Sequence, residues 1–167
     1  MSAAAPAWIG VGSNLDGPVA HVRAALDALA TIPETDFIEA SPLYGSAPMG
    51  PADQPNYVNA VVQLRTALEP HALLDALQRL EAEAGRERVG ERWGPRVLDL
   101  DLLIFGEHRI DDPRLRVPHP GIAGRIFVLR PLADMEPDLE VPGLGPVDEL
   151  LARVPEGGLW RLEADGA

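Results

Sequence analysis

The sequence predicts an α+β fold with a ferredoxin-like core, for three reasons. The predicted elements follow the order strand, helix, strand, strand, helix, strand, which is the split βαβ pattern. Both predicted helices begin at a proline, Pro18 and Pro70, and residues 57–66 alternate between two faces as a strand does. We therefore expect helices on one face of an antiparallel sheet and a ligand site on the other, with short elements at the C-terminus.

The first half of the chain supplies a strand, a helix and an interrupted strand. Residues 7–12 form a short apolar run that is typical of a buried strand. Asp16 can cap the helix that Pro18 opens. Residues 36–44 predict a second strand, and Pro42 inside it fits a sheet edge or a bulge better than a central strand.

The second half contains the two clearest strands, separated by a helix. Residues 57–66 alternate between an apolar and a more polar face: Val58, Ala60, Val62 and Leu64 against Tyr57, Asn59, Val61 and Gln63. The helix that follows ends at Gly85, a residue type common at helix C-termini, and residues 98–105 form the last strand. Long irregular stretches at 45–55 and 85–96 are of a length that is often functional.

Length and composition indicate one globular domain. A chain of 167 residues fits a single domain over residues 1–167, since domains commonly hold roughly 100 to 200 residues. The first residues lack the basic start of a signal peptide, and no apolar run approaches the ~18 residues that span a bilayer. We therefore expect a cytoplasmic protein that does not act at a membrane. A monomer is the default expectation.

The amino-acid composition and the net charge exclude several classes of function. The chain has no cysteine, which excludes thiol nucleophiles and cysteine-built zinc sites. All 14 basic residues are arginine, so any phosphate must be held by arginine, backbone amides or metal rather than by a P-loop lysine. The net charge of −12 argues against nucleic acid as a partner. One stretch is nevertheless rich in arginine and contains Arg86, Arg88, Arg92 and Arg96. It could attract a small anion, or it could be a solvated loop whose arginines pair with nearby glutamates.

Two carboxylates converge on the strand at residues 98–105. Its even-numbered leucines face the core, so Asp99 and Asp101 project together from the other face. Like charges side by side disfavour each other unless a proton or a cation intervenes, and Mg²⁺ typically takes one or two carboxylates plus substrate phosphates. A strand with one face in solvent would show the same alternation of leucine and aspartate. The pair alone therefore leaves open both a magnesium site and a simple solvent-exposed face.

The surroundings of the two aspartates favour a catalytic interpretation. If both strands follow the assigned register, Tyr57 and Asn59 lie on the same face as the carboxylates, beside the arginine-rich stretch. An amide can read the edge of a flat heterocycle, aromatic rings can stack on it, and arginine can bind phosphate oxygens. This combination suits an enzyme that joins a ring-bearing alcohol to ATP.

Four segments of the chain carry a specific pattern. They are residues 12–14 (GSN), 50–59 (GPADQPNYVN), 91–105 (ERWGPRVLDLDLLIF) and 114–120 (RLRVPHP), the last followed by Arg125 and Phe127. Over residues 7–140 the sequence resembles the 6-hydroxymethyl-7,8-dihydropterin pyrophosphokinase family of folate biosynthesis. The resemblance implies an ATP-dependent diphosphokinase that transfers pyrophosphate from ATP to the hydroxymethyl dihydropterin and releases AMP.

The resemblance also implies roles for individual residues. Asp99 and Asp101 would hold two Mg²⁺ ions that bridge the ATP phosphates, and Arg86 and Arg96 would steady those phosphates while the alcohol attacks the β-phosphorus in line. The implied pterin contacts are Ser46, Ala47, Met49, Tyr57, Asn59, Trp93 and Phe127. The implied ATP contacts are Gln78, Arg88, Arg92, Leu102, Arg114, Arg116, His119 and Arg125.

Other interpretations stay open at this point. His119 could equally be a structural loop histidine, and Phe127 could be a core residue of a short helix. The sequence departs from the family pattern at Val89, where some relatives carry a basic residue, and at Pro120, where a tyrosine is frequent. A glycosyltransferase that uses a D-x-D motif needs a larger domain. A ferredoxin-like interaction module would leave the paired aspartates unexplained.

Overall fold

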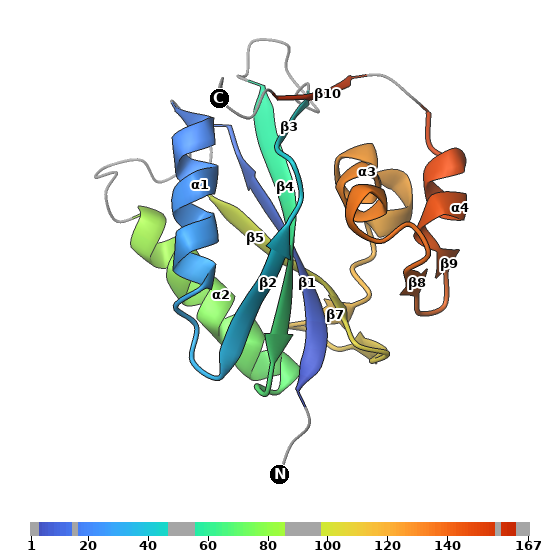
Figure 1. Ribbon diagram of the computed structural model, residues 1–167. Coiled ribbons are helices and arrows are strands. Elements are labelled where there is room, and N and C mark those ends of the chain that lie inside the picture. Colours follow the sequence, from blue (N-terminus) through green and yellow to red (C-terminus); the bar gives the residue numbers. More distant parts are fainter. Residues whose placement is uncertain (1–3, 15–16, 47–55, 86–97, 156–157, 163–167) are drawn as a thin grey trace.

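The core elements follow one another in the predicted order. The computed structural model describes residues 4–14, 17–46, 56–85, 98–155 and 158–162 (Figure 1). The core elements are β1 (Ala5–Ser13), α1 (Pro18–Leu29), β2 (Thr35–Ala40), β3 (Tyr44–Ser46), β4 (Tyr57–Thr66), α2 (Pro70–Gly85) and β5 (Asp99–Phe105). The strand expected over residues 36–44 is therefore two strands, β2 and β3.

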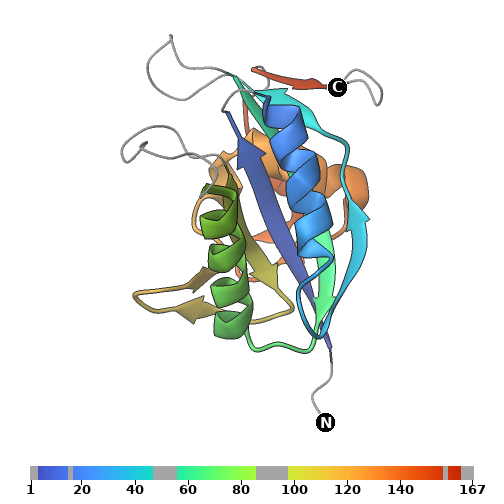
Figure 2. The same cartoon turned by 90° about the vertical axis from the view of Figure 1, so that its left-hand side faces the viewer.

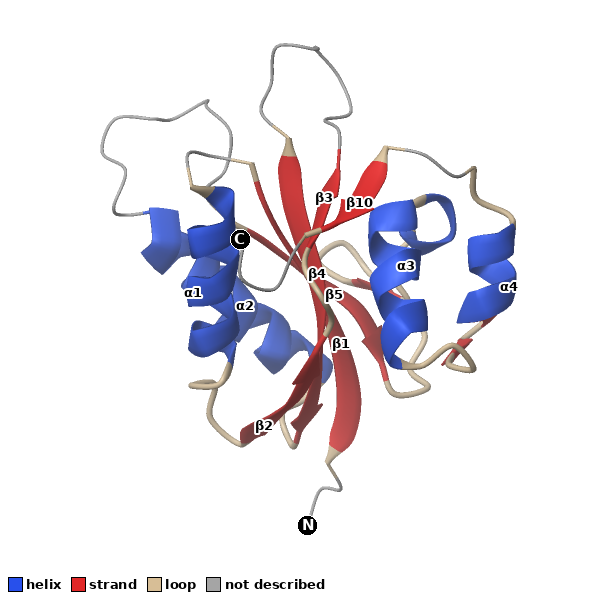
Figure 3. Ribbon diagram, turned by 45° about the horizontal axis from the view of Figure 1, so that its top comes forward, coloured by secondary structure: helices blue, strands red, loops and turns tan. Residues whose placement is uncertain are grey.

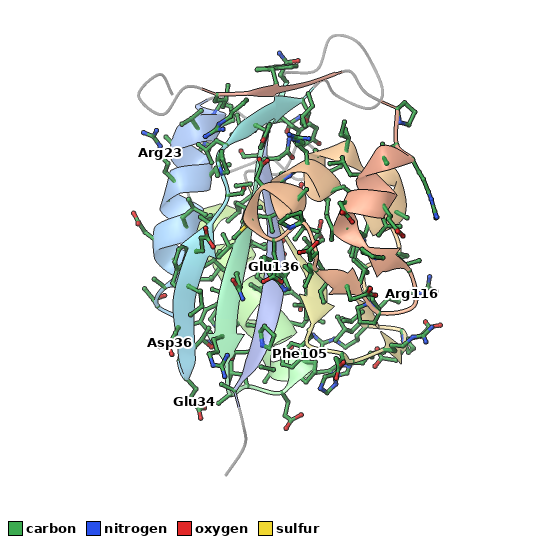
Figure 4. All side chains as sticks on the ribbon, turned by 45° about the vertical axis from the view of Figure 1, so that its right-hand side comes forward. Arg23, Glu34, Asp36, Phe105, Arg116 and Glu136 are labelled. Carbon is green, nitrogen blue, oxygen red and sulfur yellow. The ribbon has the colours of Figure 1, made fainter. Side chains whose placement is uncertain are left out.

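The C-terminal third adds short strands and helices beyond the core. These are β6 (Ile110–Asp111), β7 (Arg116–Val117), the 3₁₀ helix η1 (Ile122–Gly124), α3 (Ile126–Met135), β8 (Glu140–Val141), β9 (Gly145–Pro146), α4 (Val147–Ala152) and β10 (Leu159–Arg161). Strands β6 and β7 form one hairpin, and β8 and β9 form another. Arg116, on β7, lies at the rim of the molecule (Figure 4).

The main sheet is antiparallel and has the ferredoxin-like arrangement. Its strand order is β10, β3, β4, β1, β5, and β2 also pairs with β4. Every pair in this sheet is antiparallel. Strand β4 thus lies between β1 and the β2–β3 edge, which is the split βαβ arrangement that the order of elements predicts. The predicted fold class is confirmed.

Helices α1 and α2 cover one face of this sheet (Figure 2). Each presents an apolar stripe at helical spacing, and the fully buried residues of these stripes include Val22, Leu29, Leu73 and Leu77. They pack against the apolar even-numbered side chains of β4 and against Leu100, Leu102 and Phe105 of β5, in one continuous core. Burying one leucine in such a core contributes roughly 2 to 3 kcal/mol. No helix among the described residues has both the length and the apolar character needed to cross a bilayer.

The opposite face of the sheet is only partly free. Helix α3 packs against it, and α4 packs against the side of α3 that faces away from the sheet (Figure 3); the second core that they help to form includes Trp8, Val61 and Leu132. Trp8 is 2% exposed, as its place in an apolar strand predicts. The C-terminal elements are therefore not merely peripheral. They cover part of the face that was expected to carry the ligand site, and the site occupies the remainder.

A bulge in β5 changes which face its residues occupy. Trp8 pairs with Ile104 and Ile9 pairs with Leu102, so Leu103 has no partner of its own on β1. Before the bulge, Leu100 and Leu102 face α1 and α2; after it, Ile104 faces α3 in the second core. Simple alternation does not predict this reversal.

The break between β2 and β3 is stabilised by a serine hydroxyl. The Ser41 backbone N–H donates to Val61 O at 2.8 Å, and Ser41 Oγ accepts the Val61 N–H at 2.9 Å. Pro42 cannot donate a hydrogen bond, and the Ser41 hydroxyl replaces the backbone acceptor that a regular strand would present here. The proline predicted at an edge or a bulge therefore lies where the edge of the sheet is interrupted.

Helix α1 begins without a side-chain cap. Pro18 occupies its first turn as predicted, but the N-cap position belongs to Gly17, whose φ of 70° is in the left-handed region that glycine tolerates. Asp16, the expected cap, lies outside the described residues. The left-handed turn at Gly17 leads the chain into the helix.

Replacing a core leucine should destabilise the protein far more than replacing an exposed one. Leu77→Ala removes a fully buried side chain between α2 and the sheet, so we expect a loss of about 2 to 5 kcal/mol in the free energy of unfolding. Urea denaturation measures it. Leu144→Ala is the control, because Leu144 is 44% exposed and should change stability by less than about 0.5 kcal/mol. Equal effects of the two substitutions would contradict the described core.

Candidate active site

A pocket of about 240 Å³ lies on the part of the sheet that α3 leaves uncovered. Four strands, β1, β3, β4 and β5, contribute to its lining, and the start of α3 forms one wall. Its lining residues are Gly10, Val11, Gly12, Ser46, Tyr57, Asn59, Ala60, Asp99, Asp101, Arg125, Phe127 and Val128. The two aspartates, the amide and the aromatic rings that the sequence singled out therefore share one pocket.

Strand register explains why these side chains meet. Asn59 pairs with Gly12 across β4 and β1, and Gly12 pairs with Asp99 across β1 and β5. Residues directly opposite each other in antiparallel strands point to the same face. Because Gly12 has no side chain, the amide and the carboxylate face each other over an open floor. A Cβ atom at Gly12 would lie only 3.3 Å from Asn59 Oδ1, so even alanine would narrow this floor.

The Asn59 amide is held inside the protein. Its side chain is 6% exposed, and Asn59 Nδ2 donates to Ser46 Oγ at 2.7 Å. A buried amide that is hydrogen-bonded at one end is rigid, and its oxygen lies toward Gly12 at the pocket floor. The amide can therefore read the polar edge of a flat ligand.

A second hollow of about 480 Å³ lies on the other side of β5, between α2 and the loop that carries β6 and β7. It is wider and more polar than the pocket. Its lining residues are Leu74, Gln78, Glu81, Leu100, Asp101, Leu102, Asp112, Pro113, Arg114, Leu115, Arg116, His119 and Pro120. Asp101 lines both the pocket and the hollow, which makes the carboxylate pair the boundary between them.

Asp112 organises the outer wall of the hollow. Its Oδ1 accepts the backbone N–H groups of Arg114 at 2.9 Å and Leu115 at 2.8 Å, and its Oδ2 lies 2.7 Å from His71 Nε2. The contact with His71 and these backbone donors hold the pKa of Asp112 below its ordinary value, because each favours the charged carboxylate. The loop is thereby fixed to α2.

Arg114 is oriented by two residues of α2. Arg114 Nη2 donates to Asp75 Oδ1 at 2.7 Å and to Gln78 Oε1 at 3.2 Å. Both partners are exposed, so these contacts set a direction for the guanidinium more than they add stability. The arginine is therefore available at the rim of the hollow to meet an anionic ligand.

His119 lies half-buried where the hollow meets the carboxylate pair. Its Nδ1 accepts the Gly121 N–H at 3.0 Å, so the neutral ring carries its proton on Nε2. Burial lowers the pKa of His119, the nearby Asp101 carboxylate raises it, and the Arg125 guanidinium lowers it again. The His119 backbone N–H donates to Leu103 O at 2.8 Å, which fixes this part of the loop to β5.

Arg125 and Phe127 form the wall opposite the sheet. The Arg125 guanidinium lies 5.7 Å from the centre of the Phe127 ring, within the range of a cation–π contact. Phe127 is half-buried, packs against the second core and also lines the pocket, while its contact with a pterin stays a prediction. Arg125, grouped with the ATP contacts in the sequence, lies in the pocket with the expected pterin contacts.

The structure thus groups the predicted site residues into two neighbouring sites. Every described residue of the expected pterin set lines the pocket, and apart from Arg125 the described ATP set lines the hollow. The remaining predicted residues lie outside the described residues: Ala47, Met49, Arg86, Arg88, Arg92, Trp93 and Arg96.

One residue of the site escaped the sequence analysis. Glu81 lines the hollow, and its Oε2 accepts the Leu100 N–H at 2.7 Å. A glutamate near the end of a helix is normally solvated, so the residue type alone does not identify Glu81 as part of the site. Its position four residues after Leu77, on the apolar stripe of α2, could have identified it.

The donor set fits a magnesium ion that is shared with a ligand. Among the described residues, no group of three or more His, Asp or Glu side chains could hold a metal ion alone. Asp99 and Asp101 supply two hard carboxylates beside an open hollow, and Mg²⁺ commonly combines one or two carboxylates with substrate phosphates. A nucleotide in the hollow would complete such coordination.

Comparison with known proteins gives a consistent result. A protein-family model described as 7,8-dihydro-6-hydroxymethylpterin-pyrophosphokinase (HPPK) matches residues 8–137. A *Pseudomonas aeruginosa* protein named 2-amino-4-hydroxy-6-hydroxymethyldihydropteridine pyrophosphokinase is 54% identical over 93% of this chain and 95% of its own. A *Haemophilus influenzae* protein of the same name is 43% identical over 93% and 97%.

A solved structure agrees in fold. The crystal structure of *Plasmodium falciparum* HPPK-DHPS with pterin and p-hydroxybenzoate has a TM-score of 0.72 over 92% of this chain, at 15% identity. This chain spans 43% of the length of that one. At this identity the likeness supports the fold alone.

The lowered pKa of Asp112 predicts a measurable pH effect. Its pKa is lower in the folded state than in the unfolded chain, so its contribution to stability is present above the unfolded pKa and is lost as pH falls through the folded pKa. NMR titration of the Asp112 carboxyl carbon should report the low pKa, and His71→Ala should raise it part of the way back. An unchanged titration in His71→Ala would contradict the assigned contact.

Proposed function

The chain belongs to the 7,8-dihydro-6-hydroxymethylpterin-pyrophosphokinase family, and on that premise we propose how its two sites perform the reaction. It is an ATP-dependent diphosphokinase. We propose that it transfers pyrophosphate from ATP to 6-hydroxymethyl-7,8-dihydropterin in folate biosynthesis, giving the pterin diphosphate and AMP. The observation that carries the proposal is Asp101, which lines both the pocket and the hollow.

The pocket is the proposed pterin site. Its size, its buried Asn59 amide and its two aromatic rings suit a flat heterocycle with a polar edge. Phe127 lines the pocket from α3 and is proposed to stack on the pterin ring, with Tyr57 at the edge of the ring on the sheet side. Ser46 fixes the amide that would read the ring edge. Ala47, Met49 and Trp93 complete the proposed set on the strength of the family resemblance.

The hollow is the proposed ATP site. Gln78 and Leu102 lie on its inner walls, and Arg114, Arg116 and His119 lie along the opposite side. Arginines and an imidazole Nε2–H are donors for phosphate oxygens, and a wide polar hollow can accept a triphosphate. Arg88, Arg92 and Arg125 complete the set that we propose for ATP.

Asp99 and Asp101 are proposed to hold two Mg²⁺ ions. Bound Mg²⁺ would neutralise the phosphate charge that develops during transfer. The two carboxylates fix where the triphosphate lies relative to the pterin alcohol, because their strand is paired with the strand that forms the pocket floor. Arg86 and Arg96 are proposed to steady the phosphates.

The reaction itself is proposed to be an in-line displacement. The hydroxymethyl oxygen of the pterin forms a bond to the β-phosphorus of ATP as the bond to the α-phosphate oxygen breaks, and AMP leaves. Little covalent work falls to the protein, so positioning and charge stabilisation account for the catalysis. The pocket and the hollow meet at Asp101, where the reacting oxygen and phosphorus would face each other.

The state of the protein in the cell is part of the same proposal. We propose a single domain over residues 1–167, a monomer, a cytoplasmic location and small-molecule partners only. Light scattering on the purified protein would measure the mass of one chain if it is a monomer.

Removing one carboxylate should abolish most of the turnover without unfolding the protein. In Asp101→Asn we expect kcat to fall about 10²- to 10³-fold, because the substituted amide is a poor magnesium ligand. AMP formation from ATP and the hydroxymethyl dihydropterin is the assay, and ADP as product would contradict the proposal. Asp27→Asn, an exposed substitution on α1, is the control and should keep wild-type turnover.

Removing an aromatic wall should weaken pterin binding selectively. Phe127→Leu keeps an apolar side chain but loses ring stacking, so the KM for the pterin should rise up to about tenfold while the KM for ATP stays unchanged. Steady-state kinetics with each substrate varied in turn measure both constants. Phe37→Leu, on the face of the sheet that α1 and α2 cover, is the control. A matching rise in the KM for ATP would remove Phe127 from the pterin site.

A further inference from the structure

A glutamate of α2 completes the hydrogen bonding of the sheet edge between the two aspartates. Among the described strands, β5 pairs only with β1 and is the edge of the sheet. Its backbone groups on the far side therefore have no strand partner. The Leu100 N–H is one of them, and Glu81 Oε2 accepts it at 2.7 Å. Leu100 is the residue between Asp99 and Asp101.

The position of Glu81 on its helix is unusual for a charged residue. Leu77 and Leu73 lie one and two helical repeats before it, respectively, and both are fully buried. An apolar residue is expected next on this stripe, yet the chain has a half-buried carboxylate there. A partly buried carboxylate is costly unless it is hydrogen-bonded, and the Leu100 N–H supplies a bond of the charge-assisted kind, which is stronger than a neutral one.

This bond acts on the geometry of both aspartates. The peptide that joins Asp99 to Leu100 is planar, so a hydrogen bond to its N–H fixes the plane that carries the Asp99 carbonyl. The Leu100 side chain is buried in the first core and anchors the strand from the other direction. With β1 on one side and Glu81 on the other, the backbone from 99 to 101 is held at both edges.

We propose that Glu81 is a positioning residue for the carboxylate pair. It holds the edge of β5 so that the Asp99 and Asp101 side chains keep the separation at which they share a divalent cation with the nucleotide. The inference rests on the proposed function, because the separation of the Asp99 and Asp101 side chains matters only if they share a cation with the nucleotide. Glu81 acts on the two aspartates through its hydrogen bond to the Leu100 backbone N–H.

Two substitutions separate the hydrogen bond from the charge. Glu81→Met has similar volume and suits the apolar stripe, but it has no strong acceptor for the N–H. Glu81→Gln keeps a carbonyl acceptor and loses the charge. Glu83→Met, an exposed position two residues along the same helix, is the matched control.

The first measurement uses the metal-free protein and needs no turnover. Hydrogen exchange of the Leu100 amide, followed by NMR, should accelerate at least about tenfold in Glu81→Met and stay close to wild type in Glu81→Gln and Glu83→Met. Unchanged exchange in Glu81→Met would overturn the backbone role. This result does not depend on the identity of the substrates.

The second measurement is the magnesium dependence of AMP formation. In Glu81→Met we expect kcat to fall and the Mg²⁺ concentration for half-maximal rate to rise, each about tenfold or more, as for other residues that orient metal ligands. Thermal unfolding checks that this variant is folded at the assay temperature. Glu81→Gln should stay within about threefold of wild type, since it keeps the acceptor.

The outcomes distinguish the inference from the function on which it rests. If Glu81→Gln is impaired as severely as Glu81→Met, the charge matters and the positioning role is wrong. If Glu81→Met shows faster Leu100 exchange but wild-type magnesium dependence, the bond is structural only and the inference is again wrong. Wild-type protein that forms no AMP would refute the proposed function, while the exchange measurement would still test the contact.

Discussion

Two like charges held side by side on one strand are the constraint on which this site depends. Alternate side chains of a strand lie about 7 Å apart on the same face, so Asp99 and Asp101 cannot avoid each other by turning to opposite sides. At an effective dielectric of about 20, two full charges at that distance repel by roughly 2 kcal/mol. The fold holds the backbone of this strand in place, and a shared cation can convert the repulsion into binding.

The face of the sheet opposite α1 and α2 carries both the second core, which stabilises the fold, and the pocket. Trp8 and Val61 lie in the second core beneath α3, while Asn59 lies in the pocket. The boundary falls where β1 has glycine, because Gly12 leaves room for a ligand and Trp8 leaves none. Helix α3 belongs to both halves. Its Asp134 accepts a hydrogen bond from the Tyr44 hydroxyl of β3, which ties the wall that carries Phe127 to the sheet.

Sequence reasoning succeeded where one local rule decided the outcome. Strict alternation over residues 57–66 placed Asn59 on the site face, and Pro18 and Pro70 marked helix starts. The division of residues between the pocket and the hollow came from the family resemblance, since no pattern in the letters distinguishes the two. Their exact roles stay predictions.

Features that depend on distant parts of the chain were not predictable. The second core needs α3 to fold back over the sheet and α4 to pack on α3, and neither helix has a strong signal of where it docks. The Ser41 hydroxyl could be assigned only once Val61 was known to lie opposite it. Glu81 looked solvated because its partner is a backbone N–H nineteen residues away.

Leu103, which has no pairing partner on β1, also determines where β5 can lose a residue. Upstream of it the strand supplies charged groups to one face, and downstream it supplies Ile104 to the core on that same face. Deleting this single residue would make the ladder regular and leave Ile104 opposite Trp8 and Phe105 opposite Ala7, so both would keep their environments. The loss of a residue elsewhere in β5 would instead turn the side chains between that position and the bulge to the opposite face, so β5 should tolerate the loss of Leu103 far better than the loss of any other residue upstream of it.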